Sequence, residues 1–197
     1  DGLLTVTPYY TKPSQEGMFR HYLAIAKESP VPIILYNVPS RTGVNMEAET
    51  VIRLARASEN ITAVKEASGN LQQITQIIKY VPDQFSVVSG DDPMALPLIS
   101  VGGRGVISVV ANALPEKLST MVHLALEGKF QEAQKTHLAW NELLALLFKE
   151  GNPGGIKALL NIQGTIKNEL RSPLFRISDE TYAEIREAYL KLKDIVH

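Results

Sequence analysis

One lysine in this chain stands at a position where an amine can act as a nucleophile. The run 61–65, Ile-Thr-Ala-Val-Lys, is short and apolar, and Gly69 and Asn70 follow soon after it. A short apolar run bounded by turn residues indicates a buried parallel strand. Active sites of α/β folds lie at the carboxyl ends of such strands. Lys65 could therefore be desolvated, which lowers its pKa and yields a neutral amine that attacks ketones. The alternative is an ordinary surface charge.

Three more side chains could assist such an amine. Tyr36 ends the apolar run 33–37, and a phenol there can accept and donate a proton. Arg41 stands in the loop Pro-Ser-Arg-Thr-Gly, and its guanidinium fork suits a carboxylate. Tyr9 and Tyr10 follow another strand-like run. The alternatives are a packed aromatic for Tyr36, a surface ion pair for Arg41, and interface packing for both Tyr9 and Tyr10.

The elements that must position these residues alternate between strand and helix. We predict strands at 3–7, 33–37, 61–65, 85–89 and 105–109, with helices between them, hence a parallel sheet of βα units. We expect Ser14, Asn70 and Asp92 to be helix N-caps, with Gln73 completing a capping box and Pro93 at the first helical position. After residue 115 only helices are predicted, at 115–127, 130–148, 155–163 and 179–195.

Composition excludes several classes of protein. The 197 residues carry a net charge of −1, which argues against nucleic acid as the main partner. No apolar run approaches membrane-spanning length, and no signal peptide is visible, so we expect a cytoplasmic protein. There is no cysteine, and the four histidines are scattered, so neither thiolate chemistry nor a histidine metal site is expected.

Two motifs that resemble ligand sites have simpler interpretations. The run 102–105, Gly-Gly-Arg-Gly, resembles a phosphate loop, but it precedes a strand, so we interpret it as a helix-to-strand turn. Asp91 and Asp92 suggest a metal, but the predicted capping role accounts for Asp92.

Three motifs together resemble one enzyme family. They are Leu-Thr-Val-Thr-Pro-Tyr-Tyr at 4–10, Leu-Tyr-Asn-Val-Pro-Ser-Arg-Thr-Gly at 35–43 and Val-Lys-Glu-Ala-Ser-Gly at 64–69, and the segments 89–92 and 105–108 extend the match. The chain is similar to the pyruvate-dependent Schiff-base lyases, which include N-acetylneuraminate lyase. It most resembles the branch that makes 4-hydroxy-tetrahydrodipicolinate. The segment 152–157 corresponds to a family segment in the helical domain, but its double glycine departs from the Ile-Pro of some members.

The resemblance implies a (β/α)8 TIM barrel with a C-terminal helical extension. Residues 1–128 would hold barrel strands four to eight, and residues 129–197 the helical domain. The first three strands, with a Gly-Thr-Thr motif for the pyruvate carboxylate, would be absent, so we expect further residues before Asp1 or a partner fragment. Five strands cannot close a barrel, and we expect the chain to be inactive alone.

The resemblance also implies a role for each site residue. Lys65 would form a Schiff base with pyruvate, while Tyr36 and Tyr10 would relay protons, Tyr10 across a subunit contact. Arg41 would bind the carboxylate of L-aspartate 4-semialdehyde. The remaining roles are less direct. Ile107 would place its backbone carbonyl near Lys65, and Gly90 would let the chain pass close to the site. Tyr9 would lie at a subunit interface or near the site where free lysine inhibits some members. The side chain of Ile107 also fits barrel core, and Gly90 also fits a simple turn.

The expected function is condensation of pyruvate with L-aspartate 4-semialdehyde, on the route to diaminopimelate and lysine, without cofactor or metal. The family implies a homodimer or homotetramer. One alternative is an aldolase for N-acetylneuraminate or another 2-keto sugar acid, whose members lack an arginine in the loop that holds Arg41. A second alternative is a non-catalytic α/β binding domain in which Lys65 is structural.

Overall fold

The computed structural model describes residues 1–195 and divides into two compact units. The first spans Asp1–Ile107 and the second begins at Ser108. Residues 196 and 197, the end of the predicted helical domain, lie outside the described residues. The predicted boundary between a barrel domain at 1–128 and a helical domain at 129–197 stays a prediction.

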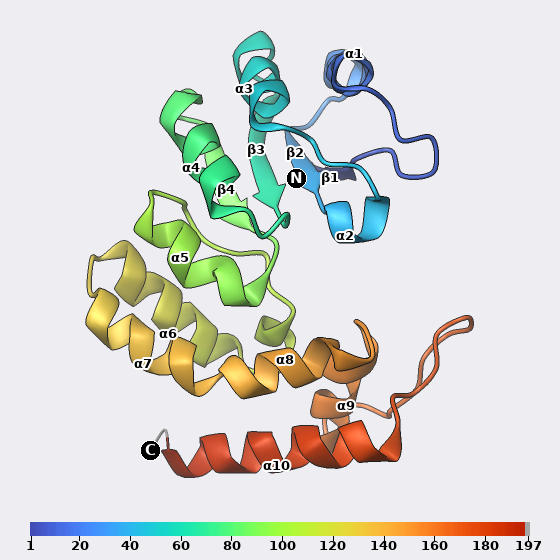
Figure 1. Cartoon of the computed structure of the whole chain (residues 1–197), viewed down its shortest axis with the longest axis vertical. Helices are drawn as coiled ribbons and strands as arrows, with labels where there is room; N and C mark the ends of the chain where they lie inside the picture. Colours follow the sequence, from blue (N-terminus) through green and yellow to red (C-terminus); the bar gives the residue numbers. More distant parts are fainter. Residues whose placement is uncertain (196–197) are drawn as a thin grey trace. The chain divides into compact units, whose positions relative to one another are not determined.

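The first unit is built around a parallel sheet (Figure 1). The sheet has four strands in the order β1-β2-β3-β4. The elements of this unit are β1 (Leu3–Val6), α1 (Gln15–Glu28), β2 (Ile33–Asn37), α2 (Pro39–Thr42), α3 (Ala48–Ala57), β3 (Ile61–Glu66), α4 (Leu71–Tyr80), β4 (Ser86–Ser89), the 3-10 turn η1 (Asp92–Met94) and α5 (Ala95–Ser100). Strands and helices alternate as the apolar runs predicted, and every strand pair is parallel.

The two faces of the sheet differ in what covers them. In β2 and β4 buried and half-buried residues alternate, as the strand period of two requires. Ile33, Leu35 and Val87 point to the side where the buried faces of α1, α3 and α4 pack, forming the core of this unit. The opposite face therefore presents the alternate residues, among them Tyr36 and Lys65, which are half-buried.

The predicted fifth strand at 105–109 is wrong. Only Val106 pairs, through a single bridge to Ser89, flanked by hydrogen bonds from Ser89 N to Gly105 O and from Ile107 N to Ser89 O. Pairing stops there because Ser108 Oγ accepts from the N–H of Ala111 and so opens a turn, the 3-10 segment η2 (Val110–Asn112).

Local signals at the helix starts were confirmed in part. Ser14 Oγ accepts from Gly17 N, and Asn70 Oδ1 accepts from Gln73 N. Asp92 is not an N-cap, because η1 begins at Asp92 itself. The run 39–43, expected as a loop, holds the single helical turn α2, which Gly43 ends in the left-handed conformation at φ +69°.

The second unit is helical. After η2 it holds α6 (Pro115–Leu126), α7 (Phe130–Ala139), α8 (Asn141–Lys149), α9 (Gly154–Ile162) and α10 (Asp179–Ile195). Helix α6 packs on α7, and α8, α9 and α10 pack on one another (Figure 1). Gly155 permits one close approach, because a Cβ there would lie 2.2 Å from the carbonyl oxygen of Leu147.

The predicted helix 130–148 is two helices. They meet at Trp140, which is 2% exposed and whose φ of −90° and ψ of −8° interrupt regular α-helix geometry. Neither proline nor glycine stands at this junction, so the sequence carries no local signal for the break.

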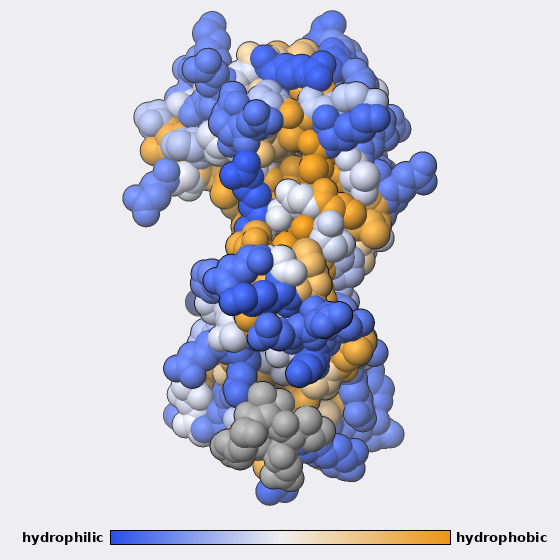
Figure 2. Space-filling model, turned by 90° about the vertical axis from the view of Figure 1, so that its left-hand side faces the viewer, coloured by the Kyte–Doolittle hydropathy of each residue, from blue (hydrophilic) through white to orange (hydrophobic). Residues whose placement is uncertain are grey.

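Apolar surface remains exposed on the first unit. On the face in Figure 2, hydrophobic residues form a strip on this unit between hydrophilic ones. Leu3 and Leu4 of β1 are 42% and 47% exposed. The helices of this unit therefore do not cover all of its apolar residues.

None of the helices among the described residues is long and apolar enough to cross a membrane.

Candidate active site

Lys65 and Tyr36 meet on the half-buried face of the sheet. They are register partners on β3 and β2, so their side chains leave the sheet side by side. The Nζ atom of Lys65 lies 4.2 Å from the centroid of the Tyr36 ring. An ammonium at this distance over an aromatic face is held by a cation–π attraction. The sequence prediction that these two residues share one sheet edge is confirmed.

The environment of Lys65 lowers the pKa of its amine on balance. Burial lowers the pKa of the Lys65 amine, because the charged form loses hydration. The carboxylate of Asp92 acts in the opposite direction and raises this pKa, and the guanidinium of Arg41 lowers it further. A lowered lysine pKa is what nucleophilic attack on a ketone requires.

Tyr36 and Asp91 are shifted toward their neutral forms. Burial raises the pKa of the Tyr36 phenol, with Asp91 raising it and Arg41 lowering it by smaller amounts. Burial and the neighbouring Asp92 raise the pKa of Asp91. A phenol that keeps its proton can donate it to an oxygen of a bound substrate.

Gly90 leaves the space that the Lys65 side chain occupies. A Cβ at Gly90 would lie 3.0 Å from Cε and 3.1 Å from Cγ of Lys65, and 2.8 Å from Cβ of Ala67. Its backbone N–H donates to the carbonyl of Glu66. The expected close passage of the chain beside the lysine is therefore present.

Arg41 stands on the short turn α2, directly after β2, and is exposed. Its charge acts on the pKa of both Lys65 and Tyr36. An exposed guanidinium is available to a carboxylate from outside the chain, which fits the predicted anion-binding role of Arg41.

The remaining predicted site residues are Tyr9, Tyr10 and Ile107, whose side chains are all exposed. Tyr9 and Tyr10 are 64% and 92% exposed, and their roles stay predictions. Ile107 is held beside the end of β4 by its bond to Ser89 O, but its side chain is 37% exposed and does not belong to the core.

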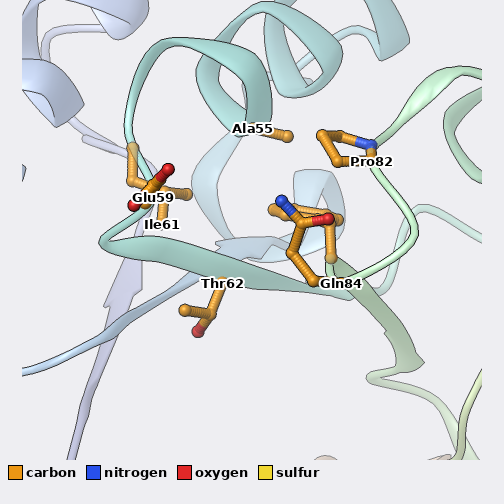
Figure 3. A pocket seen from close by; sticks show the side chains of 7 residues that line it. Ala55, Glu59, Ile61, Thr62, Pro82 and Gln84 are labelled. Carbon is orange, nitrogen blue, oxygen red and sulfur yellow. The ribbon is translucent and has the colours of Figure 1, made fainter.

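A metal site and a cavity are two alternatives to a site at Lys65. Over the part of the chain that the structure describes, no three acidic, histidine or cysteine side chains gather as metal ligands. A cavity of about 320 Å³ lies where the chain enters β3 and β4, with Glu59 and Gln84 at its walls (Figure 3). Its lining residue on β3 nearest to Lys65 is Thr62, three residues and roughly 10 Å along the strand from the lysine, so the cavity is not part of the lysine site.

Sequence reasoning missed two influences on this site. Asp92 was assigned to capping, yet its charge acts on Lys65. Asn37 and Glu66, each next to a site residue in its strand, were not singled out, although both are buried and polar. Both are polar residues at positions of a strand that face the core, and this unusual placement could have identified them from the sequence.

Comparison with known proteins decides the family. A model described as the dihydrodipicolinate synthetase family matches residues 1–192. The chain belongs to this family. The resemblance drawn from the three motifs is confirmed, including the branch.

Relatives in the dihydrodipicolinate synthetase family are longer than this chain. The 4-hydroxy-tetrahydrodipicolinate synthase of Parabacteroides distasonis is 53% identical over 192 residues, which is 98% of this chain and 65% of that protein. The chain thus spans about two thirds of the length of the curated relatives it matches.

Solved structures of the family share the fold. The dihydrodipicolinate synthase of Thermotoga maritima is 38% identical, with a TM-score of 0.95 over 99% of this chain and 67% of that one. That of Acinetobacter baumannii, described as chloride inhibited and complexed with pyruvate, is 38% identical with a TM-score of 0.92, covering 100% and 67%. This chain and both of these structures share the α/β fold with a parallel sheet.

Proposed function

We propose that the complete protein condenses pyruvate with L-aspartate 4-semialdehyde to give 4-hydroxy-tetrahydrodipicolinate, through a Schiff base on Lys65. The observation that carries this proposal is the amine of Lys65, 4.2 Å above the Tyr36 ring, with a pKa that burial lowers. Two comparisons support it: the names of the relatives, and the pyruvate in the similar Acinetobacter structure.

The chemistry begins at the keto carbon of pyruvate. The lone pair of the neutral Lys65 amine forms a bond to that carbon, and water then leaves to give an iminium ion. Because the iminium withdraws electrons, the methyl group loses a proton and becomes an enamine carbon. This carbon attacks the aldehyde carbon of the second substrate, whose oxygen takes up a proton, and the iminium on Lys65 is restored. The amino group of the second substrate then attacks the iminium carbon and displaces the Lys65 nitrogen, which takes up a proton, so the ring closes and the lysine amine is released. Tyr36 is placed to carry protons for these steps, and Tyr10 is its proposed relay partner.

Arg41 is the residue on which the choice of second substrate depends. We propose that its guanidinium binds the carboxylate of L-aspartate 4-semialdehyde. We expect Arg41→Ala to raise the KM for this substrate on the order of 10- to 100-fold while pyruvate adduct formation persists. Unchanged turnover of the semialdehyde in this variant would favour the sugar-acid aldolase instead.

The decisive experiment is borohydride reduction of the complete protein in the presence of pyruvate. We expect a stable pyruvate adduct on the peptide that contains Lys65, absent from Lys65→Ala. Lys79→Ala is the matched control, because Lys79 is exposed on α4 and should leave labelling unchanged. Failure to label Lys65 in the unsubstituted protein would reject the mechanism and favour a non-catalytic domain.

The proposal extends to the assembly and surroundings of the complete protein. We infer a closed (β/α)8 barrel, and a dimer or tetramer in which Tyr10 reaches a neighbouring subunit and Tyr9 lies at the contact. Ile107 and Gly90 are proposed to line the pyruvate site beside Lys65. A cytoplasmic location and the absence of a cofactor remain predictions from the sequence.

A further inference from the structure

A second row of residues lies one position beyond the site residues, on the other face of the sheet. Asn37 follows Tyr36 on β2, and Glu66 follows Lys65 on β3, and the two are register partners. Because side chains alternate along a strand, Asn37 and Glu66 point toward the helices. They are 0% and 1% exposed. These buried polar groups have no part in the proposed chemistry.

The carboxylate of Glu66 is surrounded by hydrogen-bond donors. It accepts from the backbone N–H of Ser68 at 2.7 Å, from Nδ2 of Asn37 at 3.1 Å and from Nε2 of Gln73 at 3.1 Å. Bonds to an ionised acceptor are stronger than bonds between neutral groups. They connect the end of β3 to β2 on one side and to α4 on the other.

The same cluster holds the segment that follows Arg41. Asn37 Oδ1 accepts from the N–H of Met46 at 2.9 Å, and Asn37 Nδ2 donates to Asn45 Oδ1 at 2.8 Å. Gln73 Oε1 accepts from Asn45 Nδ2 at 2.8 Å, and Gln73 Nε2 donates to Met46 O at 3.2 Å. The chain leaving the α2 turn is thereby bonded directly to the end of β2 and to α4, and Gln73 connects it in turn to Glu66 at the end of β3.

Two of the segments joined by these bonds, the ends of β2 and β3, carry Tyr36 and Lys65. The third, at Asn45 and Met46, directly follows the α2 turn that carries Arg41. We propose that Asn37, Glu66 and Gln73 form a positioning cluster that sets the relative placement of these three side chains. This role rests on the proposed function. The cluster residues are positioning residues, because they face away from the reacting atoms.

Energetics argue that stability alone does not explain the cluster. Burying a carboxylate is unfavourable because the charge loses its hydration, and apolar residues of similar volume often stabilise a core as well or better. What an apolar side chain cannot supply is a set of directional bonds that fixes three backbone segments in one arrangement. Misplacement by about 1 Å at a reacting group can cost on the order of 100-fold in rate.

Gln73→Met in the complete protein tests the cluster with little change of volume. It removes every hydrogen bond of the Gln73 side chain, and we expect kcat and the rate of pyruvate adduct formation to fall on the order of 10- to 100-fold. Gln72→Met and Gln76→Met are the matched controls, because these glutamines are exposed on the same helix. We expect them to stay within about twofold of the unsubstituted protein.

A second pair of variants tests the same cluster if Gln73→Met folds poorly. Asn37→Asp places two carboxylates at hydrogen-bonding distance, and Glu66→Gln removes the buried charge, so each should lower the adduct rate. The double variant restores one carboxylate facing one amide, and we expect it to recover at least about 10-fold over Asn37→Asp. Rescue of rate is not expected if the residues only fill space.

The outcomes separate the two proposals. If Lys65 labels normally, and folded Gln73→Met matches Gln72→Met in adduct rate while the double variant shows no rescue, the positioning role is wrong and the proposed function stands. If Lys65 does not label in the unsubstituted protein, the proposed function is wrong, and the positioning role that rests on it is rejected as well.

Discussion

At Lys65, burial and two side chains of opposite charge act on one amine. Burial has the largest effect and lowers its pKa, Asp92 raises this pKa, and Arg41 lowers it. Only the neutral amine attacks a ketone. The rate of adduct formation at saturating pyruvate should therefore rise with pH and level off above the pKa of the Lys65 amine in the folded protein.

The two charges should move this pH profile in opposite directions. Arg41→Gln removes a charge that lowers the Lys65 pKa, so the rise should shift to higher pH. Asp92→Asn removes a charge that raises it, so the rise should shift to lower pH. Single-turnover borohydride trapping across pH measures both, with Lys79→Gln as an unshifted control. Shifts in the same direction would show that other groups control the amine.

Gly90 offers a steric test of the same side chain. Gly90→Ala adds a methyl group 3.0 Å from Cε of Lys65 and 2.8 Å from Cβ of Ala67, so the lysine must move. We expect adduct formation to slow on the order of 10- to 100-fold and stability to fall by about 1–3 kcal/mol.

Gly69→Ala is the control for Gly90→Ala. Gly69 has a φ of +71° with nothing within 4 Å of an added Cβ, so alanine there costs about 1–2 kcal/mol of backbone strain without touching Lys65. Equal adduct rates in the two variants, measured on folded protein, would contradict a steric role for Gly90.

At the level of elements, the sequence predicted the strands and helix caps that depend on nearby residues. The four paired strands and the caps at Ser14 and Asn70 follow from apolar runs and short polar side chains. The break at Trp140 and the single bridge at Val106 depend on packing and on one serine bond, which no periodicity reveals.

Gln73 shows the same limit within the candidate site. It stands three residues after the Asn70 cap, where a capping box places its side chain back on the cap. The structure instead turns it into the buried cluster, and Ser68 Oγ accepts from the N–H of Asn70. Lys65 and Tyr36 were predictable because strand ends converge, whereas Glu66 and Gln73 depend on partners far along the chain.

The contact of α8 with α9 gives a stability prediction. Gly155→Ala places a methyl group 2.2 Å from the backbone oxygen of Leu147, which cannot rotate away, so the free energy of unfolding should fall by about 3 kcal/mol. Gly164→Ala, in open space at φ +76°, should cost about 1–2 kcal/mol. Urea unfolding of both variants of the complete protein measures the difference, and equal losses would contradict the close approach.

At the level of the whole molecule, the proposed role of Tyr10 can be tested by mixing subunits. Tyr10→Phe and Lys65→Ala should each have little activity alone. If Tyr10 of the partner subunit completes each site, a mixed dimer has one intact site, and an equal mixture that exchanges freely should recover about a quarter of full activity. Mass spectrometry verifies that the subunits have exchanged. If activity then does not recover, Tyr10 lies in the site of its own subunit or outside the site.

Trp140 is the chain's one tryptophan, and it is buried at the junction of α7 and α8 in the second unit. Its fluorescence therefore reports on the helical unit, whereas the amine chemistry belongs to the first. A shift of its emission maximum to the red on heating or in denaturant marks water entry around the indole, independent of turnover. Measuring emission and activity together would reveal whether the two units melt in one cooperative event or in succession.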